Sequence, residues 1–170
     1  MMKTNVTLIG MPGAGKSTIG IILAKELSYG FVDTDVLIQI NRQRSLQDIL
    51  DADGYLELRR IEEEEILRLN VSRQVIATGG SAVYSARAMV HLKAISTIVF
   101  IEVEFDEICR RIHNFDTRGI ACAPQQSFRA LYEERLVLYR RYAELRIDGN
   151  QLSQDELALE IAQQLGNRRV

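Results

Sequence analysis

Residues 10–17, Gly-Met-Pro-Gly-Ala-Gly-Lys-Ser, fit the pattern G-x-x-x-x-G-K-[ST] and constrain this chain more than any other segment. The apolar run before them, residues 6–9, predicts a short buried strand, and residues 18–27 predict a helix. A strand before the pattern and a helix after it are the setting in which such a loop binds nucleotide phosphates. A glycine turn that merely joins strand to helix is the alternative, and both flanks argue against it.

The residue types of this loop match a phosphate cradle. Gly13 and Gly15 allow backbone N–H groups to turn inward on the phosphates, Lys16 reaches the outer phosphates, and the Ser17 hydroxyl is placed to ligate Mg²⁺. We therefore expect ATP and Mg²⁺ as cofactors. The residues expected to contact the nucleotide here are Gly13, Ala14, Gly15, Lys16, Ser17 and Thr18.

Length and composition suit one globular domain over residues 1–170. The chain has 170 residues, of which 46% are hydrophobic and 26% charged. A net charge of −2 gives no global attraction to nucleic acid or to an anionic membrane. Without an apolar run near the ~20 residues that span a bilayer, and without a signal-type start, we expect a cytoplasmic protein. The only cysteines, Cys109 and Cys122, lie outside any C-x-x-C spacing, which favours two reduced thiols.

Strand-like and helical segments alternate along the chain. Strands are predicted at 6–9, 31–33, 75–77, 98–103 and 145–147, and helices at 18–27, 46–50, 56–69, 86–92, 107–112, 128–142 and 154–165. Ser45 with Asp48, and Ser153 with Glu156, are spaced as helix caps. This alternation predicts a parallel sheet covered on both faces, with ligands beyond the carboxyl ends of the strands.

Two carboxylates follow the second predicted strand. Asp33 could face Mg²⁺, directly or through water, and Asp35 could accept the proton of an acceptor hydroxyl. Either aspartate could instead cap a helix that begins at Val36. The phosphate loop favours the functional interpretation, because a kinase needs a metal ligand and an oriented acceptor.

A further candidate for binding is Arg59, which on a helix faces both Glu62 and Glu63. The group could be a solvated ion-pair face, or an anion clamp in which a glutamate orients the arginine toward a substrate carboxylate. Gly79 and Gly80 follow the third predicted strand, where backbone can approach a small ligand closely, although a plain turn would need no function.

Taken together, these motifs resemble the shikimate kinase family over nearly the whole chain. The matching segments are 10–18, 33–35, 54–62 with Arg59 in the family's F-R position, Gly79-Gly80, and 135–139 in the R-x-P-L-Y position. The resemblance implies an α/β, three-layer P-loop kinase fold with a five-stranded parallel sheet and helices on both faces. An acceptor-binding helical region at about 34–62 and a lid at about 113–126 would complete the domain. Such enzymes transfer the γ-phosphoryl of MgATP to the 3-hydroxyl of shikimate, in aromatic amino acid biosynthesis. We expect a monomer with a small hydroxy-acid substrate.

The resemblance also assigns roles to residues. Lys16 and Ser17 would hold ATP and Mg²⁺, Asp33 would support the metal, and Asp35 would receive the acceptor proton. Arg118 matches the lid arginine that closes on the phosphates, and Arg111 matches the arginine against adenine. The residues that would bind the acceptor are Asp35, Arg59, Gly79, Gly80 and Arg135, and the catalytic residues would be Lys16, Asp35 and Arg118.

Departures from the family pattern concentrate in the acceptor site. Ser81 replaces the third glycine of G-G-G, Leu58 replaces the phenylalanine before the clamp arginine, and Leu50 stands where another phenylalanine is usual. Val137 and Gly119 replace the prolines of R-x-P-L-Y and R-P-L-L.

Three alternatives remain open. One is a kinase for another small hydroxylated carboxylate, which the acceptor-site changes favour. A GTPase is disfavoured: residues 51–54 fit D-x-x-G, but they follow an amphipathic helical stretch and no N-K-x-D motif exists. A catalytically silent module that binds nucleotide or nucleic acid is the third, because arginines are frequent in the carboxy-terminal third, although acidic residues are interleaved with them.

Overall fold

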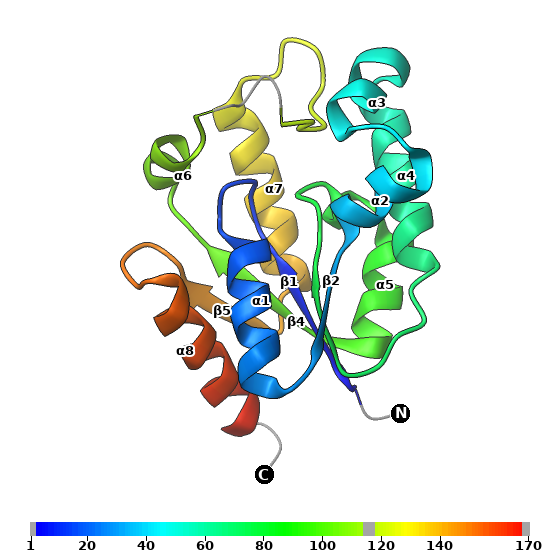
Figure 1. The fold of residues 1–170 in the computed structure, drawn as a ribbon. Coiled ribbons are helices and arrows are strands. Elements are labelled where there is room, and N and C mark those ends of the chain that lie inside the picture. Colours follow the sequence, from blue (N-terminus) through cyan, green and yellow to red (C-terminus); the bar gives the residue numbers. More distant parts are fainter. Residues whose placement is uncertain (1–2, 114–117, 168–170) are drawn as a thin grey trace.

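A parallel five-stranded sheet forms the centre of the protein (Figure 1). The computed structural model describes residues 3–113 and 118–167. The strands are β1 (Asn5–Ile9), β2 (Gly30–Asp33), β3 (Gln74–Ala77), β4 (Ser96–Glu102) and β5 (Leu145–Asp148), in the order β2-β3-β1-β4-β5. In the register of the central strand, Val6 pairs with Val75 on one side and with Thr97 on the other. All five predicted strands are confirmed.

Helices cover both faces of this sheet, which confirms the three-layer α/β prediction (Figure 1). On one face, α1 (Lys16–Leu27) packs beside α8 (Gln154–Asn167). The other face carries α5 (Ala86–Ile95) and α7 (Phe128–Tyr142), which contact β4. The remaining helices are α2 (Thr34–Arg42), α3 (Leu46–Asp53), α4 (Tyr55–Leu67), the 3-10 turn η1 (Ala82–Tyr84) and α6 (Phe105–Arg111).

Local capping explains where several helices begin. Ser45 and Asp48 form a reciprocal capping box at α3. At α8, the Ser153 N–H donates to Glu156 over 2.8 Å and the Glu156 N–H donates back to the Ser153 hydroxyl over 3.3 Å. Both predicted caps are therefore confirmed. The predicted helix at 107–112 differs from α6 at both ends: α6 begins two residues earlier, where Phe105 packs its ring 5.7 Å from that of Phe128, and it ends one residue earlier.

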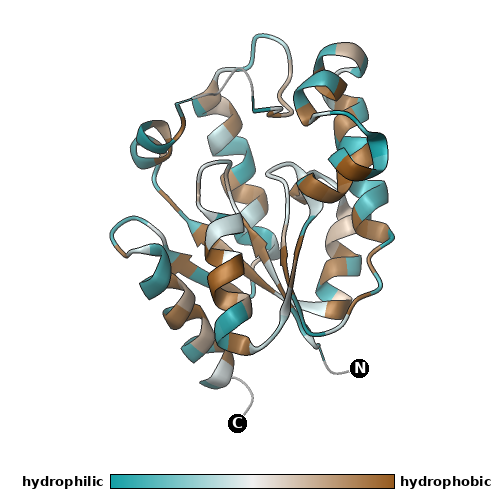
Figure 2. Cartoon of the chain, viewed as in Figure 1, coloured by the Kyte–Doolittle hydropathy of each residue, from teal (hydrophilic) through white to brown (hydrophobic). Residues whose placement is uncertain are grey.

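The hydrophobic interior has two parts. The main core contains the inner strands and the facing sides of the surrounding helices, and Figure 2 shows largely apolar strands between helices that carry both polar and apolar residues. A smaller core joins α2, α3 and α4 through Ile38, Ile49, Leu58 and Ile61, and Ala121 packs into it. The residues around the acceptor site thus have packing of their own. Across residues 3–113 and 118–167, no helix combines the length and the apolarity needed to cross a membrane.

Candidate active site

A cavity of about 160 Å³ opens at the carboxyl ends of β1, β2 and β3. The phosphate loop lines one side and residues 78–81 line another, while residues 118–121 and Arg135 close it. This is the place where ligands bind in open parallel sheets, and it is the place predicted from the alternation of elements.

The phosphate loop has the backbone geometry that its glycines predict. Gly13 and Gly15 have φ angles of 84° and 92°, in the left-handed region that glycine adopts without strain. The Lys16 ammonium donates to the carbonyl oxygens of Gly10, at 2.8 Å, and Met11, at 2.9 Å. Burial lowers the pKa of Lys16 to about 8, although the charge of Asp35 opposes this shift. The loop therefore holds one buried ammonium group beside the cavity.

The Asp33 carboxylate accepts hydrogen bonds from both α2 and the phosphate-loop end of α1. One carboxylate oxygen, Oδ1, accepts from the backbone N–H groups of Asp35, at 3.0 Å, and Val36, at 3.3 Å, and caps α2. The other, Oδ2, accepts from the Ser17 hydroxyl at 2.5 Å. A hydroxyl and a carboxylate side by side at the phosphate loop are oxygen donors of the kind that Mg²⁺ prefers, so this pair fits that ion. The capping alternative is therefore confirmed, and it leaves Oδ2 of the same carboxylate beside Ser17.

Asp35 and Glu62 flank Gly79 inside the cavity. A Cβ atom on Gly79 would lie 2.6 Å from Asp35 Oδ1 and 2.2 Å from Glu62 Oε1, so only glycine leaves room for both carboxylates. Burial raises the pKa of Asp35 to about 6, and the charge of Asp33 adds to the shift. Asp35 is thus a carboxylate suited to accept a proton near neutral pH.

Glu62 binds Ser81 and not Arg59, the partner that helical spacing predicts. Its side chain is 3% exposed, its Oε2 accepts from the Ser81 hydroxyl, and its Oε1 has no hydrogen-bond partner among the described residues. Burial and the charge of Asp35 raise the pKa of Glu62 to about 7. Ser81, which stands in place of the family's third glycine, therefore binds the glutamate expected to orient Arg59.

Both candidate carboxylate-binding arginines reach the carbonyl oxygen of Ala121. Arg135 is 1% exposed and donates to this oxygen at 2.7 Å, and Arg59 donates to it at 3.4 Å. Arg135 lines the cavity, whereas Arg59 lines an adjoining cleft that shares Ser81 with it. Gly80 must be small, because a Cβ atom there would lie 2.6 Å from Arg135 Nη1. The structure thus brings Asp35, Gly79, Gly80 and Arg135 together and places Arg59 at their border.

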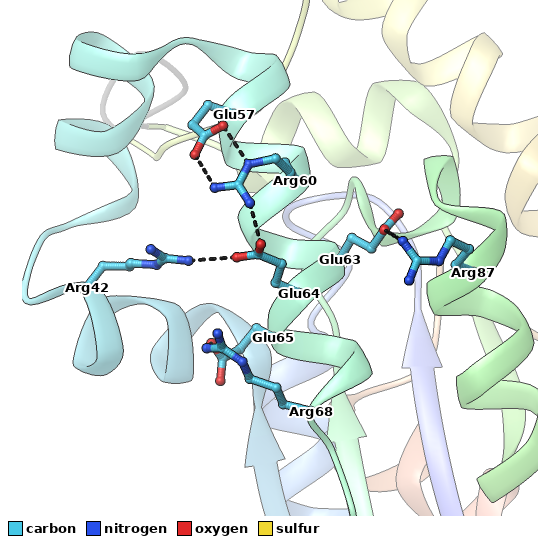
Figure 3. A network of polar contacts seen from close by, with 8 residues as sticks. All are labelled: Arg42, Glu57, Arg60, Glu63, Glu64, Glu65, Arg68 and Arg87. Atoms are coloured by element: carbon cyan, nitrogen blue, oxygen red, sulfur yellow. Dashed lines mark hydrogen bonds and ion pairs between the residues drawn. The ribbon is translucent and has the colours of Figure 1, made fainter.

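On the polar face of α4, the arginine that forms ion pairs is Arg60 and not Arg59. Arg60 binds Glu57 and Glu64, and Arg42 of α2 also binds Glu64, at 2.9 Å (Figure 3). In the part of the chain that the structure describes, no ion pair joins Arg59 to Glu62 or Glu63, so neither glutamate partner expected for Arg59 is formed. The reason is that Glu62 turns inward to Ser81, while Glu63 binds Arg87, at 2.9 Å, and Ser85.

Arg111 and Arg118 line a second cavity, between the phosphate loop and α8. Arg111 is fixed by Glu107, at 2.7 Å, and by the Gly149 carbonyl, at 2.8 Å. Arg118 lines both cavities, so it lies between the predicted nucleotide and acceptor sites. Residues 114–117 of the predicted lid lie outside the described residues. The Cys109 and Cys122 thiols are free.

The fold and the phosphate loop together define a P-loop kinase, a class of phosphotransferase. A thymidylate kinase from Candida albicans shares this fold, with a TM-score of 0.59 at 13% identity over 98% of this chain and 92% of that one.

More specifically, the chain belongs to the shikimate kinase family, whose model matches residues 12–166. The shikimate kinase of Mycobacterium avium strain 104 is 41% identical over 152 residues, which are 88% of this chain and 86% of that protein. Shikimate kinase from Acinetobacter baumannii, solved in complex with shikimate, superposes with a TM-score of 0.91 at 28% identity, over 99% of this chain and 96% of that one.

Proposed function

We propose that this protein transfers the γ-phosphoryl group of ATP to the 3-hydroxyl of shikimate. The observation that carries the proposal is the joint placement of Lys16, Asp35 and Arg135 around one cavity at the carboxyl ends of the strands. A phosphate-binding ammonium, a carboxylate with a raised pKa and a buried guanidinium are the groups needed to position a triphosphate and a hydroxy acid for direct transfer.

On the nucleotide side, residues 13–18 bind the phosphates through backbone N–H groups and the Lys16 ammonium. Ser17 and Asp33 would hold Mg²⁺, and the ion would neutralise phosphate charge. Arg111, which lines the second cavity, would lie against the adenine, and Arg118, which lines both cavities, would add positive charge near the transferred group.

On the acceptor side, Arg59 and Arg135 bind the carboxylate, and Gly79 and Gly80 let the substrate approach the backbone. Asp35 accepts the proton of the 3-hydroxyl while the new bond forms between that oxygen and the γ-phosphorus. The bond from the γ-phosphorus to its bridging oxygen breaks, and ADP leaves with the electron pair. Residues 118–121 cover the cavity and keep water from competing for the phosphoryl group.

A second candidate is a kinase of the same mechanism for another small hydroxylated carboxylate. The observation in its favour is the wall of the cavity, where Leu58 and the Ser81–Glu62 pair stand in place of a phenylalanine and a glycine.

A coupled ADP-release assay on shikimate, quinate, gluconate and homoserine distinguishes the two candidates. We expect turnover on shikimate with a kcat/KM at least about tenfold above the others, which corresponds to about 1.4 kcal/mol in transition-state binding. Turnover only on another acid would replace the proposal with the second candidate. ATP binding without turnover on any of these acids would indicate a nucleotide-binding protein without kinase activity.

We also propose that the protein is a cytoplasmic monomer. Sedimentation of the purified protein would test the oligomeric state.

A further inference from the structure

One aromatic ring lies close to Arg59 and more loosely beside Arg135, the two arginines assigned to the acceptor carboxylate. The guanidinium carbon of Arg59 lies 3.6 Å from the ring centroid of Tyr84, and that of Arg135 lies 5.6 Å from the same centroid. Tyr55, in the first turn of α4, lies on Arg59 more loosely, at 5.1 Å. Tyr84 belongs to η1, Arg59 to α4 and Arg135 to α7, so one side chain joins three elements.

The position of Tyr84 is itself fixed by its neighbours. Its hydroxyl donates to Glu134, one residue before Arg135 on α7. The turn that carries Tyr84 begins directly after Ser81, whose hydroxyl binds the buried Glu62. The ring is therefore anchored at its tip to α7 and at its backbone to the floor of the cavity.

Both guanidinium groups retain donors that no protein atom uses. The Nε atoms of Arg59 and Arg135 are buried and have no hydrogen-bond partner among the described residues. A buried charged group without its full set of hydrogen-bond partners is costly, and an anion bound beside these two arginines would lower that cost. With no ion pair from Glu62 or Glu63, the contacts that orient Arg59 are the close Tyr84 ring, the more distant Tyr55 ring and the Ala121 carbonyl.

We propose that Tyr84 is a positioning residue for acceptor binding: its ring holds Arg59 and Arg135 in one orientation for the carboxylate of the substrate. This inference rests on the proposed function. Cation–π attraction to the ring orients the guanidinium groups, as an ion pair with a glutamate would. Unlike a glutamate, the ring adds no negative charge that would compete with the substrate carboxylate. Two residues of this chain create the need for this role. Ser81 binds Glu62 and so removes it from Arg59, and Tyr84 contacts both arginines in its place.

Three variants test this role through the kinetics of both substrates. Tyr84→Leu keeps apolar volume and removes the ring, and we expect the KM for shikimate to rise about 5- to 30-fold, with kcat and the KM for ATP within about twofold of wild type. Tyr84→Phe keeps the ring and removes the hydroxyl, and should restore most of the affinity. Tyr29→Leu is the matched control, since it removes a tyrosine from a guanidinium, that of Arg73 at 5.7 Å, far from the cavity.

A substrate analogue separates positioning from general damage. Wild type should prefer shikimate over its methyl ester, which lacks the negative charge, and in Tyr84→Leu this preference should shrink by the same factor as the rise in KM. If Tyr84→Leu does not fold, as judged by thermal unfolding, Tyr84→Met carries the same test. An unchanged KM in the folded ring-less variant, or an equal defect in Tyr84→Phe, would overturn the inference. Wild type without activity on shikimate would instead refute the proposed function.

Discussion

The nucleotide side and the acceptor side of this site are built in different ways. The nucleotide side is mainly one contiguous loop, in which glycine φ angles and a lysine bound to the Gly10 and Met11 carbonyls set the geometry within a few residues. The acceptor side combines one or two lining side chains from each of α2, α4 and α7 with the segments at 78–81 and 118–121. A site assembled from distant segments can change its specificity by single substitutions, whereas a loop that binds through its backbone can change little without losing its ligand.

If the nucleotide side and the acceptor side act separately, Asp35→Asn should cause the largest loss of activity among the variants proposed here and leave nucleotide binding intact. We expect kcat to fall about 10²- to 10⁴-fold, because the amide cannot accept the hydroxyl proton. Calorimetric titration with ADP should give an unchanged affinity. Asp106→Asn, at an exposed ion pair with Arg129, is the control and should keep full activity. Normal turnover by Asp35→Asn would show that this carboxylate is not the base.

A smaller effect, confined to acceptor affinity, is expected from Arg59→Ala. Losing a charge-assisted hydrogen bond to the carboxylate should raise the KM for shikimate about 10- to 100-fold with little change in kcat. Arg60→Ala, the neighbouring arginine that binds Glu57 and Glu64 on the outer face (Figure 3), should change neither value by more than about twofold. Equal defects in the two variants would mean that Arg59 acts through the stability of α4.

The pH profile of kcat/KM should show the titration of one group on the acceptor side, Asp35, and one on the nucleotide side, Lys16. Asp35, whose pKa burial raises to about 6, must be ionised to accept a proton, so activity should fall about tenfold per unit below pH 6. Lys16, whose pKa burial lowers to about 8, must be protonated to bind phosphate, so activity should also fall above pH 8. Initial rates between pH 5 and 9 measure both limbs. A flat rate between pH 5 and 7 would contradict the acidic assignment.

The smallest effect is expected where the lid segment meets α3. Gly119 has a φ angle of 65°, and its N–H donates to Gln47 Oε1 at 2.9 Å. Proline, the residue usual in the family here, has neither this φ angle nor an N–H group. Gly119→Pro should therefore lower kcat/KM about threefold to tenfold, and Gln47→Ala, which removes only the hydrogen bond, by less. A more active Gly119→Pro variant would show that this contact does not support the site.

The sequence predicted the fold and the phosphate loop well because both depend on local rules. Alternating apolar strands and periodic helices imply a covered parallel sheet, and capping residues such as Ser45 and Ser153 act within one helical turn. For Asp33, the sequence offers a helix cap and a metal role as alternatives, because it cannot show that the two oxygens of one carboxylate bind different partners.

Partner choice on the acceptor side was decided by the tertiary structure alone. Glu62 is three residues from Arg59, yet it binds Ser81, 19 residues further along the chain. Arg135 binds Ala121, and Tyr139 binds the Gly80 carbonyl across 59 residues. No signal in the sequence marks Tyr84, an aromatic residue in a short turn, as the ring beneath two arginines. A buried polar group takes whichever partner packing brings within about 3 Å, and that distance depends on how whole helices meet. Local sequence thus determined the geometry of the phosphate loop, and the packing of α4, α7 and η1 determined the arrangement of the arginines that we propose bind the acid.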